Sequence, residues 1–152
     1  MVEQRTENPR VSGSTPLLGI FERRCKMAKL SKEAMDMFND PKAYKVIATV
    51  DSQGKLNVAV KGSLMAIDEE TIVYSELYGK RTKENLEATK KAAIVAFKGT
   101  TTYQAKGTLQ GFKTSGDVFD KAAKTVKERF NLDIKNAAII KVEEVSGGAI
   151  RM

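Results

Sequence analysis

Residues 71–97 have the sequence TIVYSELYGKRTKENLEATKKAAIVAF, in which two apolar segments flank a short basic turn and a helix-forming segment. The two apolar segments predict β-strands at Thr71–Glu76 and Ala92–Lys98, because both are short, apolar and rich in β-branched residues. Between them, Thr82 is the expected N-cap of a short helix. The order strand, turn, helix, strand therefore organises the middle of the chain.

The turn itself, Gly79-Lys80-Arg81-Thr82, predicts a phosphate-binding site. Free backbone N–H groups, the positive end of the helix dipole and two cationic side chains are expected to meet there. Arg81 could bind two phosphate oxygens at once, and Thr82 and Asn85 would add neutral hydrogen bonds. The alternative is a solvated loop, which is the usual role of a Lys-Arg pair.

Residues from the neighbouring strands extend this candidate site. Ser75 ends the strand before the turn, so its hydroxyl could reach the same anion, whereas Tyr74 belongs either to the site or to the core. In the segment 56–64, Lys61 is a single cation on a face of small residues, where a flat ligand could approach the backbone. The alternative is an ordinary solvent face with one lysine. By alternation that face holds Asn57, Ala59, Lys61 and Ser63, and the expected core face holds Leu56, Val58, Val60 and Leu64.

Composition favours one soluble domain. The chain has 152 residues, of which 41% are hydrophobic and 30% charged. We expect a folded domain at residues 28–146, a disordered or extraneous extension at 1–27 and a C-terminal tail at 147–152. The apolar runs are far shorter than the roughly 18 to 20 residues that cross a bilayer, so no membrane association is expected.

Missing residue types exclude several kinds of chemistry. The chain has no histidine, which excludes Ser-His-Asp hydrolysis and histidine-ligated zinc. Its single cysteine, Cys25, forms no intrachain disulfide and fits a reducing cytoplasm. The net charge of +7 is spread along the chain among acidic residues, so nucleic-acid binding is not expected. No spacing of acidic side chains supports paired acid/base catalysis, and no metal site is expected.

Six antiparallel strands and flanking helices are predicted overall. A helix begins after the N-cap Ser31 and ends before Pro41, and a second apolar helical face covers Ser115 to Phe130. Short turns connect the first five strands as a meander, which favours a mainly β fold, a closed or split barrel, over a parallel α/β sheet. The six strands are Tyr44–Val50, Leu56–Ile67, Thr71–Glu76, Ala92–Lys98, Tyr103–Phe112 and Ala137–Val145.

This order of elements resembles the pyridoxamine 5′-phosphate oxidase-like family of FMN-binding split barrels, in particular its short single-domain members. The resemblance covers about residues 28 to 145, and its most specific part is YSELYGKRTKENLEA. It implies that the FMN phosphate is held by Lys80, Arg81 and Thr82, with Ser75, Tyr74 and Asn85 beside them. It also implies that the isoalloxazine ring lies along Ala59, Val60, Lys61 and Gly62, and that Gln104 contacts the flavin edge from the partner subunit.

The resemblance further implies a cytoplasmic homodimer that transfers electrons or hydride between a reduced donor and a small acceptor. Two alternatives stay open, an FMN-binding electron carrier with no substrate of its own and a binder of a deazaflavin coenzyme. No residue is proposed as a catalytic acid or base. The absence of histidine argues against oxidation of vitamin B6 and against the haem-degrading relatives.

Overall fold

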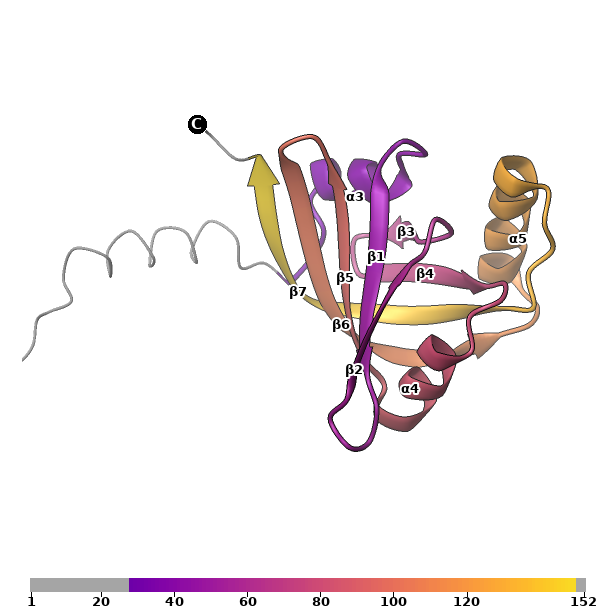
Figure 1. The fold of residues 1–152 in the computed structure, drawn as a ribbon. Helices are drawn as coiled ribbons and strands as arrows, with labels where there is room; N and C mark the ends of the chain where they lie inside the picture. Colours follow the sequence, from indigo (N-terminus) through magenta and orange to yellow (C-terminus); the bar gives the residue numbers. More distant parts are fainter. Residues whose placement is uncertain (1–27, 150–152) are drawn as a thin grey trace, which may run out of the picture.

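The computed structural model describes residues 28–149, which form a mainly β split barrel with flanking helices (Figure 1). The predicted fold class is confirmed, although the described residues contain seven strands where six were expected. The predicted strand Leu56–Ile67 is interrupted at residues 61–64. In chain order the elements are α3 (Lys32–Asn39), β1 (Tyr44–Val50), β2 (Leu56–Val60), β3 (Met65–Asp68), β4 (Thr71–Glu76), α4 (Arg81–Thr89), β5 (Lys91–Lys98), β6 (Thr101–Lys113), α5 (Asp117–Phe130) and β7 (Asn136–Ala149).

All seven strands belong to one antiparallel sheet in the order β2-β1-β5-β6-β7-β4-β3. Its two edge strands, β2 and β3, follow each other in the chain and are joined only by residues 61–64. So short a connection spans less than about 20 Å even when fully extended. The sheet must therefore curl until its edges approach each other, and residues 61–64 lie at the split between them.

The prediction of a continuous meander is wrong between the third and fourth expected strands. β4 pairs with β7, whereas β5 pairs with β1, so the chain crosses from one half of the sheet to the other between them. Helix α4 supplies the length for this crossing, and it packs mainly against β1. The basic turn consequently lies where the chain leaves β4 to cross the barrel.

Packing of apolar side chains fixes the barrel and its helices. The interior is filled by fully buried residues from several strands, among them Ile47, Ile72 and Ile94. Ser31 caps α3 as predicted, because its hydroxyl accepts a hydrogen bond from the Ala34 N–H at 3.1 Å. α3 packs against β3 and β5, and α5 packs against β4 and β7 (Figure 1).

The last strand is longer than predicted. β7 continues past Val145 to Ala149, so residues 147–149 pair with β6 where a tail was expected. A Cβ on Gly147 would overlap the backbone of Thr102 and Tyr103, so glycine allows this close pairing. The proposed extension at 1–27 lies outside the described residues. Within 28–149 no helix is long and apolar enough to cross a membrane.

Candidate functional site

The apolar face of β2 lies on the outside of the barrel. Leu56, Val58 and Val60 are 76%, 66% and 75% exposed, so the prediction that they belong to the core is wrong. β2 is an edge strand, and these side chains point away from the barrel interior, whereas Leu64, beyond the strand, is buried. We call Leu56, Val58 and Val60 the outer apolar face. Three adjacent exposed aliphatic side chains are typical of an interaction surface.

A pocket of about 280 Å³ lies at the split of the barrel. One wall is held together by Ser63, whose hydroxyl donates to the Ser75 carbonyl at 3.1 Å and accepts from the Ser75 N–H at 3.3 Å. These bonds fix the segment between β2 and β3 against β4. The pocket is lined by Val60, Lys61, Gly62, Ser63, Ser75, Leu77, Tyr78, Gly79, Phe130 and Leu132.

Ser75 lines this pocket, and its buried hydroxyl is unpartnered among the described residues. The residue is 1% exposed, and its Oγ has no hydrogen-bond partner among the described residues. An unsatisfied buried hydroxyl costs about 1 to 3 kcal/mol. A polar ligand group that reached Ser75 Oγ would remove that cost.

Lys61 brings a cation to the same pocket. Its Nζ lies 5.2 Å from the ring centroid of Tyr74, within the range of a cation–π contact. A Cβ on Gly79 would overlap this Nζ, so the ammonium group lies directly against the Gly79 backbone. Within residues 28–149 no carboxylate oxygen comes within 4.0 Å of it.

Tyr74 lies in the core, beneath the site. It is fully buried, and its hydroxyl donates to Glu76 Oε1 at 2.9 Å. Burial raises the pKa of the Tyr74 hydroxyl far above its ordinary value, and the hydrogen bond to Glu76 raises it further. Tyr74 is therefore a neutral, fixed ring on which the Lys61 ammonium group rests.

Helix α4 does not begin as predicted. Its N-cap is Lys80, whose backbone is already helical, so the prediction of Thr82 as N-cap is wrong. Among the described residues, no side chain forms a capping hydrogen bond at the N-terminal end of α4. Thr82 is instead buried in the first turn. Asn85 is also buried, and its amide donates to Thr49 Oγ1 at 3.1 Å. Thr82 and Asn85 thus face the barrel, while the N–H groups of the first turn have no side-chain cap.

The two basic residues of the turn are exposed at the start of α4. Lys80 pairs with Glu84 at 3.8 Å on the helix surface. Arg81 lies within electrostatic reach of Asp51 in the β1–β2 turn. The pKa of the Asp51 carboxyl is lowered mainly by the Lys55 N–H that donates to it, and Arg81 adds to this effect. Neither cation lines the pocket, although Gly79 of the same turn does.

Gln104 lies apart from these residues in one protomer. It is in register with Val95, Val46 and Val60 across neighbouring strands, three strands away from Val60. Three interstrand spacings amount to about 14 Å. Of the predicted site residues, Val60, Lys61, Gly62 and Ser75 line the pocket, Tyr74 lies in the core beneath Lys61, and Gln104 lies on the outer surface of the sheet.

The far wall of the pocket was not predicted from the sequence. Phe130 and Leu132, at the end of α5, contribute apolar side chains, and Phe130 lies so close to Gly62 that a Cβ there would come within 3.2 Å of the ring. The apolar face of α5 predicts helix packing but not which strand edge its end meets. Gly79 was a visible signal, because a glycine before a basic pair permits close approach of another group.

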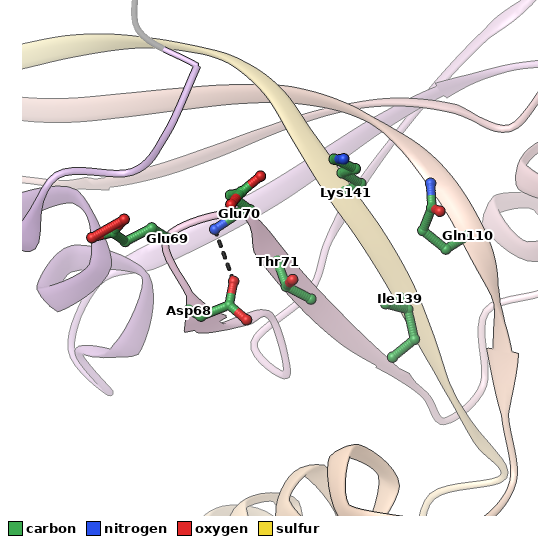
Figure 2. Close-up of a pocket in the computed structure, with 7 residues that line it drawn as sticks. All are labelled: Asp68, Glu69, Glu70, Thr71, Gln110, Ile139 and Lys141. Carbon is green, nitrogen blue, oxygen red and sulfur yellow. Dashed lines mark hydrogen bonds between the residues drawn. The ribbon is translucent and has the colours of Figure 1, made fainter.

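A second and larger cavity, of about 430 Å³, lies on another side of the barrel (Figure 2). Figure 2 shows Asp68, Glu69 and Glu70 of the β3–β4 turn on one side of this cavity and Lys141 and Gln110 on the other. Two of these carboxylates have partners of their own: Glu70 pairs with Lys29 at 3.8 Å, and Asp68 accepts a hydrogen bond from the Glu70 N–H. Within the part of the chain that the structure describes, no cluster of acidic, cysteine or histidine side chains could hold a metal ion. This cavity contains none of the predicted site residues.

Comparison with protein families decides the classification. Residues 30–147 match the family described as pyridoxamine 5′-phosphate oxidase. The chain belongs to this family. No curated protein matches it.

Several solved structures share this fold. HupZ from Group A Streptococcus is 27% identical, with 81% of this chain and 99% of that chain covered and a TM-score of 0.69. An FMN-binding protein from Syntrophomonas wolfei is 21% identical, with 93% and 98% covered and a TM-score of 0.73. HutZ from Vibrio cholerae, described as a haem storage protein, is 16% identical, with 79% and 95% covered and a TM-score of 0.55. Solved structures that share this architecture are thus described with different ligands.

Proposed function

We propose that this member of the pyridoxamine 5′-phosphate oxidase family is a homodimeric flavoprotein that binds FMN and transfers electrons or hydride to a small acceptor. The observation that carries the proposal is the pocket at the split of the barrel. It is lined by Ser75, whose buried Oγ is unpartnered among the described residues, and by the cation Lys61, whose Nζ has no carboxylate oxygen of residues 28–149 within 4.0 Å. A polar, negatively charged ligand with a flat ring fits these groups.

The chain's own residues would divide the binding of FMN between them. Lys80, Arg81 and the uncapped N–H groups of α4 would hold the phosphate at the helix start, where the dipole favours an anion. The backbone at Ala59, Val60 and Gly62 would support the ring, and Ser75 would donate its hydroxyl proton to a ligand oxygen. FMN when bound supplies the redox chemistry, while the protein orients the ring and sets its electrostatic environment.

A second copy of the chain would complete the site. The pocket of one protomer, about 280 Å³, falls just below the range of roughly 300 to 1,000 Å³ that is typical of small-molecule sites. Val60 belongs both to the pocket and to the outer apolar face. Pairing of two protomers through that face would bury its aliphatic side chains and could bring the partner's copy of Gln104 to the flavin edge.

The electron-carrier alternative has its own support. Among the described residues that line the pocket, Lys61 and Tyr78 are the only titratable side chains, and no carboxylate or histidine is present for proton transfer. Such a lining suits electron transfer as well as it suits hydride transfer. Steady-state oxidation of NAD(P)H would support an enzyme, whereas reversible photoreduction without turnover would support a carrier.

Haem is the ligand named for one structural neighbour. Histidine is a common axial ligand of haem iron, and this chain contains none. The groups at the pocket are instead suited to bonding with oxygen atoms. FMN is therefore preferred over haem here.

The direct test is to identify the ligand. We expect purified protein incubated with FMN to retain the absorption bands of oxidised flavin after gel filtration, and heat to release FMN that mass spectrometry identifies. Release of a deazaflavin would show that this coenzyme, and not FMN, is the ligand. A colourless protein that takes up neither compound would contradict the proposal.

A further inference from the structure

We propose that Tyr74 and Gly79 position the Lys61 ammonium group beside the flavin ring and thereby determine how strongly the protein prefers reduced to oxidised FMN. This inference rests on the proposed binding of FMN. It assigns Tyr74 and Gly79 the role of positioning residues that act through Lys61.

The first positioning contact is the face of the Tyr74 ring. Lys61 Nζ lies 5.2 Å from the ring centroid, where the negative face of the ring attracts a cation. The ring itself is fixed, because Tyr74 is fully buried and its hydroxyl is bonded to Glu76 at 2.9 Å. A flexible lysine side chain is thereby held by a rigid group of the barrel core.

The second positioning contact is the backbone of Gly79. Any side chain at position 79 would occupy the space of the Lys61 ammonium group. The space is therefore available because residue 79 has no Cβ. Lys61 approaches from the end of β2 and Gly79 from the turn after β4, so this contact joins two segments that are distant in sequence.

The position of this charge matters because reduction adds negative charge to the flavin. A fixed ammonium group stabilises the reduced ring more than the oxidised ring, so it strengthens binding of reduced FMN selectively. No carboxylate oxygen of residues 28–149 lies within 4.0 Å of Lys61 Nζ to cancel its charge. Lys61 also lines the pocket, together with Ser75.

Gly79→Ala is the sharpest variant. Its methyl group would displace only the mobile end of Lys61, so the barrel should remain folded. We expect Lys61→Met and Gly79→Ala each to weaken binding of reduced FMN at least tenfold relative to oxidised FMN, which lowers the midpoint potential by about 30 mV for a two-electron couple. Tyr74→Leu should do the same, whereas Tyr74→Phe keeps the ring and should leave the ratio close to wild type.

A double-mutant cycle separates positioning from a direct effect. If Gly79 acts through Lys61, Gly79→Ala should change the potential no further in a Lys61→Met background. An additive effect of the two substitutions would overturn the inference. Equal potentials for wild type, Lys61→Met and Gly79→Ala, measured with FMN bound to all three, would also overturn it while leaving the proposed function intact.

A measurement without FMN tests the same geometry independently. The Hε protons of Lys61 should show an upfield ring-current shift in the NMR spectrum of the FMN-free protein, and this shift should be lost in Gly79→Ala and kept in Tyr74→Phe. An unshifted Lys61 signal in wild type would overturn the proposed positioning. Failure of wild type to bind FMN would instead contradict the proposed function.

Discussion

Asn85 of α4 donates a hydrogen bond from its side-chain amide to the hydroxyl of Thr49 on β1, at 3.1 Å. Both residues are 3% exposed, so the bond lies inside the protein. It connects the crossover helix to the barrel. The basic turn immediately before α4 is therefore held against β1 by a buried polar contact.

Asn85→Ala should destabilise the fold. Removal of the amide leaves the Thr49 hydroxyl without this partner, and loss of such a buried bond costs about 1 to 3 kcal/mol. Urea unfolding of wild type and variant, without added FMN, measures the change. Asn85 was predicted to contact the cofactor, so the Kd for FMN should also be measured. A normal unfolding free energy with weakened FMN binding would show that Asn85 serves the ligand and not the fold.

The local sequence pattern predicted the individual helices, strands and turns better than it predicted how they pack together. The Ser31 cap and the Asp51–Gly54 turn could be predicted from residue type alone. In the structure Asp51 Oδ1 accepts hydrogen bonds from the Gln53 and Lys55 N–H groups, and Gly54 adopts a positive φ of 84°. Burial on β2 was not foreseeable, since alternation separates two faces but does not say which one is covered.

The same holds for the candidate site: its local turn could be predicted from the sequence, but its contacts between distant segments could not. The basic turn could be located from sequence, because a helix start and two cations lie within a few residues of each other. The contact of Lys61 with Gly79 and Tyr74 depends on the curling of the sheet, which no local spacing encodes. The end of α5 reaches the pocket for the same reason.

Ser75→Ala should have opposite effects on folding and on ligand binding. Without a ligand, the substitution removes an unpartnered buried hydroxyl, so the free energy of unfolding should stay unchanged or rise. With FMN, loss of one hydrogen bond should weaken affinity by about 0.5 to 1.5 kcal/mol. Thermal unfolding and FMN titration measure the two effects. Ser52→Ala, in the exposed β1–β2 turn, is the control and should leave FMN affinity unchanged.

Arg81→Ala should weaken FMN binding by about 1.5 to 3 kcal/mol, because it removes a charge-assisted bond to the phosphate. The matched control is Lys124→Ala, which removes one exposed positive charge from α5. Fluorescence titration with FMN and with riboflavin, which lacks the phosphate, separates the binding energy of the phosphate from that of the rest of the flavin. If Arg81→Ala weakened both ligands equally, phosphate would not be its target.

Val58→Glu should dissociate the proposed homodimer. Val58 is 66% exposed at the centre of the outer apolar face, and two carboxylates brought together at a paired face would be desolvated close to each other. We expect a dimer for wild type and a folded monomer for Val58→Glu in analytical ultracentrifugation. Thr114→Glu, exposed in the β6–α5 connection, should remain dimeric. A monomeric wild type would refute the assembly.

The buried residue Lys45 makes the free energy of unfolding depend on pH. Lys45 on β1 is 2% exposed, and burial, aided by the nearby charge of Arg129, lowers its pKa from 10.5 to about 8, although Asp40 opposes the shift. Between these two pH values the unfolded chain binds more protons than the folded chain at this residue. Stability contributed by Lys45 therefore rises with pH from about 8 to 10.5.

Lys45→Met should reveal this effect, because methionine keeps much of the apolar stem without the charge. At pH 7 Lys45 is protonated in both states, so the full penalty of the buried charge is present, and the variant should be more stable by up to about 3 kcal/mol. That advantage should shrink as the pH rises from 8 to 10.5, since wild-type Lys45 becomes neutral in the folded state first. Urea unfolding at several pH values, with the exposed Lys42→Met as control, measures the difference. A constant difference between Lys45→Met and wild type across this range would show that Lys45 keeps an ordinary pKa in the folded protein.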